Sequence, residues 1–418
     1  MASYDDVAYV VTVPSSVSGV IFDGLMVNGD NPLTTSPFTA NGANPDADEG
    51  ISITGDGAIV RNCVVKNIFQ FGISMGATSA ASARFGEVTD NYLENIPYWA
   101  AILAYDSYYA EVSGNTIVNA WRGVQADNHY LAVPEGQTAS ISNNTITTGI
   151  QAITGDSIYE DYDGILHNLQ YGASVWTIAN NSITNTSLSN TNGDSDGIEV
   201  WSILDAATVS ITGNTIANFP NGYTLWHCPA TAGVTVSGGS VSGAINGVVA
   251  TNHDNFGSAT SSSYTISGVA IAASTAGVVV NDSALNDNGA SVTLALTGGS
   301  ISGGATGLSV SGADATVTLG ATAFTGQSGN HIALVGNANA IDATTATFGG
   351  NTGAAATLAQ NFDIEDKISH KLDDSALGLV RVKSSNVFVA SRVDHGHQHV
   401  TNRRDLLPFE MAFEDTVA

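Results

Sequence analysis

The stretch Val112-Ser-Gly-Asn115-Thr-Ile117 returns as Ile141-Ser-Asn-Asn144-Thr-Ile146 and again as Ile178-Ala-Asn-Asn181-Ser-Ile183. The shared pattern is apolar-x-x-Asn-x-apolar. We assign further copies, with and without the Asn, to Ile59–Val64, Val88–Leu93, Ile211–Ile216, Ile21–Met26, Val236–Val241, Ile266–Ile271, Leu296–Ile301 and Leu319–Phe324. Successive centres lie 23 to 38 residues apart, as expected for a repeated structural unit with loops of variable length.

A second, glycine-led segment usually follows each copy. Examples are Gly72-Ile-Ser-Met, Gly123-Val-Gln-Ala, Gly149-Ile-Gln-Ala, Gly197-Ile-Glu-Val and Gly222-Tyr-Thr-Leu. Short alternating strands broken by Gly and Asn, with almost no helical periodicity, predict an all-β solenoid in which each repeat forms one coil. Neighbouring coils would pair about 4.8 Å apart and bury a column of Ile, Val and Leu.

This pattern resembles the right-handed parallel β-helix, or pectin-lyase-like superfamily, over roughly residues 15–355. The resemblance implies a single-stranded right-handed parallel β-helix of about 11–12 coils. The Asn column has two interpretations. Stacked amides could satisfy buried backbone groups, or they could bind a ligand; we favour the structural role.

The charge distribution divides the chain. The whole protein has 11 Lys and Arg against 38 Asp and Glu, for a net charge of −27. Residues 1–360 hold 4 basic and 28 acidic residues (4 − 28 = −24), whereas residues 361–418 hold 7 and 10. Such a surface excludes nucleic acid, which needs a Lys/Arg footprint. No apolar run is long enough to predict membrane insertion.

The composition shift predicts three regions. Residues 1–360 would form the β-helix, 361–390 a small strand-rich connector, and 391–418 a tail of uncertain structure. Residues 361–390 and 162–171 resemble parts of large bacterial surface and adhesin-like proteins. That resemblance implies an extracellular or cell-surface location, although no signal peptide is recognised in this chain. It also leaves self-association or neighbours in a parent chain as partners.

The bulky aromatic residues are concentrated in one part of the repeat. All 5 Trp and 10 of the 13 Tyr fall between residues 92 and 226. They either pack loops onto the solenoid or contact a polysaccharide or cell-surface glycan, because sugar faces stack on aromatic rings. For the second alternative we predict a ligand-binding strip of outward residues, namely Tyr105, Gln125, Asp127, His129, Gln151, Trp201, Trp226 and His227.

Catalysis is the competing hypothesis. A glycoside hydrolase needs two carboxylates, and Asn192-Gly-Asp-Ser-Asp196-Gly-Ile-Glu199 loosely resembles the Asp-Gly stretch of polygalacturonase-like hydrolases. The catalytic candidates are Glu199, Asp196 and Asp127, with Asp127 and Glu199 expected two coils apart. Asp-Gly also recurs at Asp163-Gly164, which turn geometry would explain. A polysaccharide lyase or epimerase is less favoured, because the body lacks cations to hold an acidic polymer.

Loop carboxylates suggest a cation site. Asp161, Asp163, Asp194 and Asp196 are hard oxygen ligands of the kind that Ca²⁺ prefers. We expect no required cofactor, with Ca²⁺ as the alternative. The sequence therefore favours a structural or adhesive surface β-helix with a carbohydrate-contact face over a carbohydrate-active enzyme.

Overall fold

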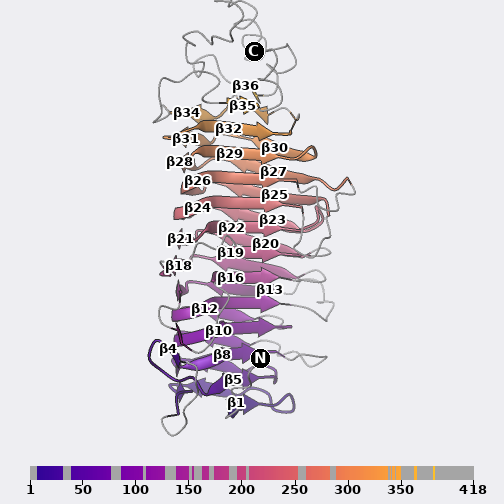
Figure 1. The fold of residues 1–418 in the computed structure, drawn as a ribbon. Coiled ribbons are helices and arrows are strands. Elements are labelled where there is room, and N and C mark those ends of the chain that lie inside the picture. Colours follow the sequence, from indigo (N-terminus) through magenta and orange to yellow (C-terminus); the bar gives the residue numbers. More distant parts are fainter. Residues whose placement is uncertain are drawn as a thin grey trace, which may run out of the picture. The chain divides into compact units, whose positions relative to one another are not determined.

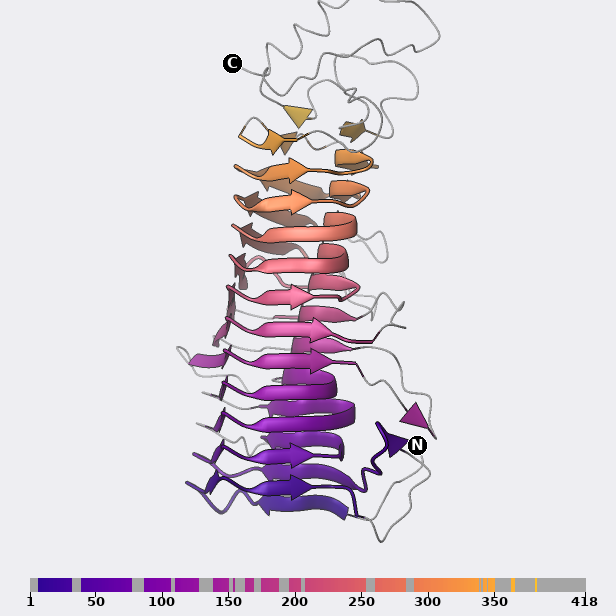
Figure 2. The ribbon, with the colours of Figure 1, turned by 90° about the vertical axis from the view of Figure 1, so that its left-hand side faces the viewer.

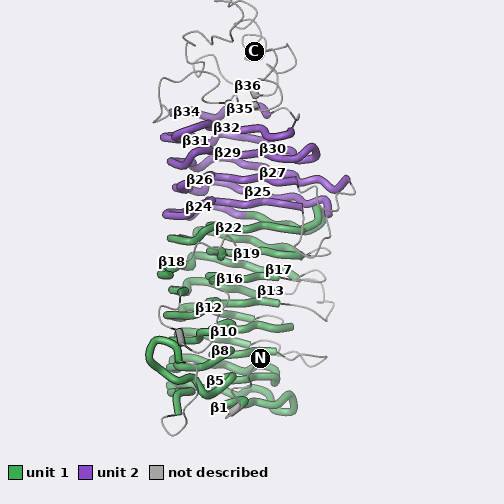
Figure 3. The backbone as a smooth tube through the Cα atoms, in the orientation of Figure 1, with its two compact units in different colours: residues 1–235 green, residues 236–418 purple. Residues whose placement is uncertain are grey.

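The computed structural model describes residues 7–31, 39–76, 86–106, 110–127, 138–149, 153–154, 162–168, 174–187, 195–203, 207–252, 260–282, 289–337, 339, 341–343, 345–349, 362–364 and 380–381. These residues form strands, turns and bends, in two compact units of residues 1–235 and 236–418 (Figure 3). Within these ranges no helix is long and apolar enough to cross a membrane.

Three faces wrap unit 1, and neighbouring coils pair in parallel on each face (Figures 1 and 2). The strands of faces 1 and 3 belong to one hydrogen-bonded sheet, and those of face 2 belong to a second. Face 1 contains β1 (Val7–Val13), β5 (Ala47–Ile53), β8 (Ile68–Met75), β10 (Tyr92–Tyr105), β12 (Thr116–Asp127), β16 (Asp163–Asn168), β19 (Asp196–Trp201) and β22 (Asn221–Trp226). Face 2 contains β2 (Ile21–Asp23), β6 (Ile59–Arg61), β9 (Glu87–Thr89), β11 (Glu111–Ser113), β13 (Thr138–Ser142), β17 (Val175–Ala179) and β20 (Thr208–Thr212).

Face 3 completes each coil of unit 1. It contains β3 (Met26–Asn28), β7 (Val64–Lys66), β14 (Thr145–Thr148), β18 (Ser182–Asn185) and β21 (Thr215–Ala217). The first halves of β10 and β12 belong to this face, and both strands then bend into face 1 at register shifts. Outside the coils, β4 (Thr39–Ala40) pairs antiparallel with β15 (Ile153–Thr154).

Unit 2 repeats the parallel pairing with smaller side chains. One set of strands is β24 (Ser240–Thr251), β26 (Ala270–Asn281), β28 (Ser300–Ser302), β29 (Thr306–Ser311), β31 (Ala323–Thr325), β32 (Asn330–Val335), β34 (Thr347–Phe348) and β35 (Phe362–Ile364). The other is β25 (Ser262–Ser267), β27 (Val292–Thr297) and β30 (Ala315–Leu319), while β33 (Ile341–Asp342) pairs with β36 (Val380–Arg381). β23 (Gly233–Ser237) spans the boundary in the sequence.

The predicted all-β parallel solenoid is confirmed, with two corrections to the repeat near its start. The register aligns Val60 with Val88, so the apolar pair of that coil is Val60 and Val65 rather than Ile59 and Val64. One coil earlier the same shift applies: Ile21 and Met26 are exposed, and Phe22 and Val27 take the inward positions. Sequence alone misplaced both copies because apolar residues stand side by side there.

The Asn column is a continuous hydrogen-bonded ladder inside unit 1. Its members, which are at most 2% exposed, are Asn91, Asn115, Asn144, Asn181 and Asn214. The Oδ1 of Asn144 accepts from the backbone N–H (2.9 Å) and the side-chain Nδ2 (3.0 Å) of Asn115. Its own Nδ2 donates to the Val112 carbonyl (3.0 Å) and to Asn181 Oδ1 (2.9 Å). The structural interpretation of the column is therefore confirmed.

Asn62 does not belong to this ladder, contrary to the sequence assignment. The ladder position of its coil is held by Cys63, whose backbone N–H donates to Asn91 Oδ1 at 2.9 Å. Asn62 instead occupies the preceding turn with a φ of 53°, a left-handed conformation that Asn tolerates better than most residues. Its Nδ2 donates to Asp23 Oδ1 at 2.9 Å.

The ladder predicts a large cost for removing one rung. Asn144→Ala leaves buried donors of Asn115 and the carbonyl of Val112 unsatisfied, so we expect the free energy of unfolding to fall by about 3 kcal/mol. Thr145→Ala, at an exposed neighbouring position, should change it by less than about 0.5 kcal/mol. Urea unfolding of both variants measures the difference. Equal losses of unfolding free energy would show that the ladder hydrogen bonds do not stabilise the fold.

A histidine occupies the apolar interior of unit 1. His167 on β16 aligns with Ala126 and Val200, which are fully buried, and its ring lies 4.8 Å from that of Trp176. Neither ring nitrogen has a hydrogen-bond partner. Burial lowers the pKa of His167 from 6.5 to about 3, because the charged form cannot be solvated there.

This lowered pKa predicts acid sensitivity. The unfolded chain binds a proton at His167 below about pH 6.5, whereas the folded chain does so only near pH 3. Stability should therefore be constant above the unfolded value and fall below it by up to about 1.4 kcal/mol per pH unit. Because carboxylates also titrate in acid, the measured quantity is the difference in unfolding free energy between the natural chain and His167→Leu. A difference that does not change with pH would contradict the assignment.

Candidate functional site

Parallel pairing on face 1 arranges the outward side chains in columns. We define three columns by their place relative to the inward residue near the start of each strand, which is Ala101 in β10 and a glycine in the other four strands. Column A precedes this residue by one position, and columns B and C follow it by two and four. Column A contains Ala100, Arg122, Asp163, Asp196 and Asn221. Column B contains Leu103, Gln125, Leu166, Glu199 and Thr224. Column C contains Tyr105, Asp127, Asn168, Trp201 and Trp226.

Three carboxylates converge where columns A and B meet. One oxygen from each of Asp163, Asp196 and Glu199 lies within 4.8 Å of the others, and all three residues are at most 7% exposed. Gly197 makes this geometry possible: a Cβ there would collide with Ile216, so the backbone turns inward between Asp196 and Glu199. Both carboxylates therefore stand on the same outer side of the strand.

Arg122 supplies positive charge to this acid cluster. Its Nε lies 2.7 Å from Asp163 Oδ2, with 13% of the Arg122 side chain and none of the Asp163 side chain exposed. The guanidinium carbon also lies 4.8 Å from the ring centre of Trp121, in cation–π contact. Three carboxylates and one guanidinium give a formal charge of −2, which favours a bound cation.

Polar neighbours fix the remaining members of the cluster. The Thr224 hydroxyl donates to Asp196 Oδ1 at 2.5 Å, and the Asp196 backbone N–H donates to Asp163 Oδ1 at 3.3 Å. Three oxygens within 4.8 Å are close enough to share one Ca²⁺, whose bonds to oxygen are about 2.3–2.6 Å long. The donor set thus fits a hard divalent cation.

A second network joins columns B and C. Trp99 Nε1 donates to Gln125 Oε1 at 2.8 Å, and Gln125 Nε2 donates to Asp127 Oδ2 at 2.6 Å. Gln125 and Asp127 are both buried. Asp127 is therefore a hydrogen-bonded partner of the amide beside it.

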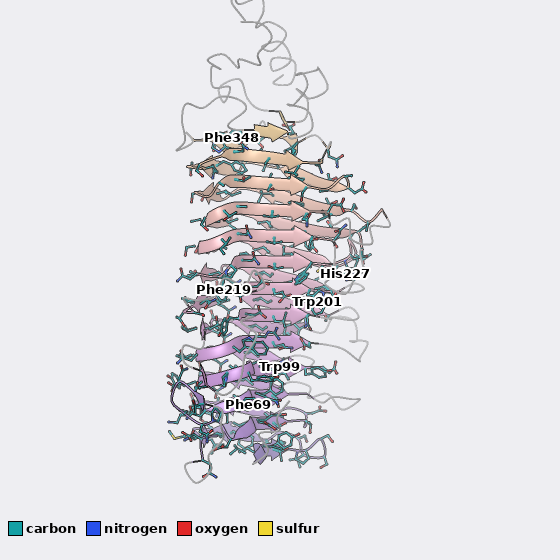
Figure 4. The ribbon with its side chains drawn as sticks, viewed as in Figure 1. Phe69, Trp99, Trp201, Phe219, His227 and Phe348 are labelled. Atoms are coloured by element: carbon teal, nitrogen blue, oxygen red, sulfur yellow. The ribbon has the colours of Figure 1, made fainter. Side chains whose placement is uncertain are left out.

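Two indoles form the partly exposed end of column C. The rings of Trp201 and Trp226 lie 6.0 Å apart with an angle of 35° between their planes. Beside them, His227 Nδ1 contacts the Ser202 hydroxyl at 3.1 Å, and Figure 4 shows Trp201 and His227 near the carboxyl ends of their strands. His227 has a φ of 53°, which turns the chain immediately after β22.

The other aromatics mostly pack segments onto the coils. Phe69 and Tyr98 stack at 4.8 Å, and Tyr98 lies 5.9 Å from Trp121. Together with Tyr162 they surround Ala40 of β4, which is fully buried. This group therefore packs a loop onto the coils, whereas the Trp201–Trp226 pair remains partly open, and contact with a glycan stays a prediction for that pair.

Several sequence-predicted site residues take different places. Asp127 and Glu199 lie two strands apart, as expected. The carboxylate that lies close to Glu199 and Asp196 in the acid cluster is that of Asp163, not that of Asp127. The Asp-Gly dipeptides at Asp163 and Asp196 begin face 1 strands, so their interpretation as turns was wrong. Sequence reasoning also missed Arg122 and assigned no role to Thr224; the repeated tripeptide Asp-Gly-Ile was the signal that could have found the carboxylates.

The coil after β12 differs from its sequence assignment. Gly149-Ile-Gln-Ala was expected to provide its face 1 strand, but β16 pairs with β12 and Leu166 takes the register position opposite Gln125. Ile153, directly after the assigned segment, pairs with Ala40 in β4 instead. The remaining predicted residues, His129, Gln151, Asp161 and Asp194, lie outside the described residues.

We predict that the stability of the fold depends strongly on the Arg122–Asp163 ion pair of the acid cluster. Arg122→Ala removes the partner of a fully buried carboxylate, so the free energy of unfolding should fall by about 3–5 kcal/mol. Arg61→Ala is the matched control, because the Arg61–Asp23 pair is 46% exposed on both sides, water screens its attraction, and its loss should lower the free energy of unfolding far less. Adding Asp163→Asn to Arg122→Ala should recover part of the loss in urea unfolding. Equal losses in the two single variants would refute a buried pair.

Comparison with known families agrees with this fold. Residues 23–159 match the family model described as a right handed beta helix region, which covers the face 1 strands from β5 to β12 and the coils around them. Neither the curated proteins nor the solved structures gave a significant match.

Proposed function

We propose that this right-handed parallel β-helix binds a neutral glycan along face 1 of unit 1, in a structural or adhesive role outside the cell. The Trp201–Trp226 pair beside the acid cluster is the observation that carries the proposal. Sugar rings stack on indoles, and their hydroxyls pair with carboxylates and amides. Here the two kinds of group stand in adjacent columns on successive coils.

The distribution of side chains supports a site confined to these coils. The matching strands of unit 2, three led by glycine and β32 by His331, carry small or uncharged residues at the same three offsets. They are Asn246, Ala276, Thr306 and Asn330 for column A, Val249, Val279, Ser309 and Ala333 for column B, and Thr251, Asn281, Ser311 and Val335 for column C. A solenoid can therefore form without carboxylates or indoles at these positions, which argues that unit 1 holds them for a ligand.

Charge favours a neutral glycan over a polyuronate. Of the four basic residues in 1–360, Arg122 is held by Asp163, Arg61 pairs with Asp23, Lys66 lies on β7 of face 3, and Arg84 lies outside the described residues. An acidic polymer would meet a face whose carboxylates outnumber its cations. The proposal requires no cofactor; Ca²⁺ shared by Asp163, Asp196 and Glu199 is the alternative, and it would reduce this repulsion.

A carbohydrate-active enzyme is the second candidate. The convergence of Asp163, Asp196 and Glu199 supports it, because glycoside hydrolysis needs an acid and a second carboxylate close together. Their low exposure favours cation capture over hydrolysis, since a scissile bond has to reach both groups. A lyase or epimerase would further need a cation to neutralise its uronate.

Glycan binding should depend on the indole pair. We expect immobilised neutral polysaccharides to retain the protein, and Trp201→Ala or Trp226→Ala to weaken binding about tenfold each through loss of one stacking contact. Tyr92→Ala removes an exposed aromatic from face 3 and should leave binding unchanged. Affinity electrophoresis against neutral polysaccharides and polyuronates, with and without Ca²⁺, measures these effects.

The same panel separates the two candidates. Release of reducing ends or unsaturated products that is abolished by Glu199→Gln would replace the adhesive role with catalysis. Binding that survives both Trp substitutions would reject the contact face. Retention of polyuronates only when Ca²⁺ is present would replace the neutral glycan with an acidic one.

A further inference from the structure

The first coil of unit 1 presents an unpaired backbone edge. Among the described strands, β1, β2 and β3 each pair with the next coil only, through β5, β6 and β7 respectively. β1 therefore lies at the end of the stack of face 1 strands (Figure 1). An edge strand offers backbone donors and acceptors to another strand, and proteins usually protect such an edge with charged residues or proline.

The side chains of this coil are apolar where they meet solvent. Nine large hydrophobic side chains are exposed among the described residues, and five of them belong to this coil, namely Tyr9, Val10, Val17, Ile21 and Met26. The inward residues Val11 and Phe22 are only partly buried, whereas Ile51 and Val60, which align with them one coil later, are fully buried. The apolar core is therefore open at this end of unit 1, and covering it would be favourable.

Charge is absent from the same surface. Residues 7–22 contain no Asp, Glu, Lys or Arg, in a chain whose net charge is −27. Asp23, the first charged residue after them, is paired with Arg61 at 2.9 Å. Two copies of so acidic a chain repel each other wherever their carboxylates face, so they can approach most easily through a surface that carries no charge.

The backbone of β1 alternates between its partner strand and the edge. The carbonyl of Val13 accepts a hydrogen bond from the backbone N–H of Thr54 at 2.9 Å, so Val13 faces β5. Because successive residues of a strand direct their N–H and C=O groups to opposite sides, Val11 and Tyr9 face β5 as well. The residues whose N–H and C=O groups point to the unpaired edge are then Ala8, Val10 and Thr12.

We propose that this edge is a dimer interface, at which two copies of the chain pair through β1. A two-fold axis perpendicular to the coil stack brings the same edge of both copies together and makes the two β1 strands antiparallel. When the axis passes near Val10, the midpoint of β1, the edge-facing groups of Ala8, Val10 and Thr12 in one copy bond the same groups in the other. A second copy matches this surface in strand length, lack of charge and exposed apolar residues, and the two open cores cover each other.

Association of the full chain tests the interface. Sedimentation equilibrium should show a reversible monomer–dimer equilibrium whose association constant rises about tenfold between about 0.05 and about 0.5 M NaCl, because salt screens the repulsion between the acidic bodies. Residue-resolved hydrogen exchange at rising protein concentration should show increasing protection of the amides of Ala8, Val10 and Thr12. The amides of Tyr9, Val11 and Val13, which face β5, should be protected in the monomer as well.

A charge at the centre of the interface should break the dimer. Val10→Lys places one ammonium group from each copy beside the two-fold axis and should weaken dimerisation at least about tenfold. Ile245→Lys in β24 is the matched control, because Ile245 is 40% and Val10 42% exposed, and both changes remove the same amount of net negative charge. It should leave the dimer as stable as in the natural chain.

A chain that stays monomeric at both salt concentrations would overturn the proposal, as would equal weakening of the dimer by the two Lys variants. Protection of Ala8, Val10 and Thr12 that does not depend on protein concentration would also overturn it, because another segment of the same chain would then cover the edge. The exchange pattern of the natural chain decides this even if Val10→Lys fails to fold.

Discussion

Backbone pairing between successive coils is the constraint on which this structure depends. Parallel strands about 4.8 Å apart hold equivalent residues in register, so that residues distant in sequence become neighbours in space. Asp163 and Asp196 are 33 positions apart, yet the backbone N–H of one donates to the carboxylate of the other. The Asn ladder follows the same rule, since each amide bonds the equivalent amide of the next coil. Core, ladder and acid cluster are three consequences of one register.

The inward glycines connect this register to the chemistry of face 1. Gly164 and Gly197 face neighbouring isoleucines with no room for a Cβ, which bends the strand and puts the preceding Asp on the outer side. The residue before the glycine is thereby placed beside the residue two positions after the glycine, as Asp196 and Glu199 are around Gly197. The same backbone feature tightens the core in both units, and in unit 1 the positions around it carry the acids that converge as the acid cluster.

The fold could be predicted from the sequence because the repeat is visible in it. The Asn positions and the glycine-led strands are local patterns, and both fell close to their true register in most coils. The acid cluster was harder to find. Its members come from different coils, and choosing between Gly149 and Gly164 as the leader of one strand requires knowing which segment pairs with β12. Arg122 was overlooked because its role depends on Asp163 lying opposite it.

The high negative charge takes on a more specific meaning in the light of the structure. Part of it is surface charge, but Asp163, Asp196 and Glu199 are withdrawn from solvent around a single guanidinium. Burying a carboxylate costs free energy unless it gains hydrogen-bond or ionic partners inside the protein. Solubility does not explain this cost, because acids on the surface provide it equally well. Arg122, Thr224 and the backbone N–H of Asp196 offset part of that cost. This excess of buried negative charge beside the indoles agrees better with the proposed uncharged, hydroxyl-rich ligand than with a polyanion.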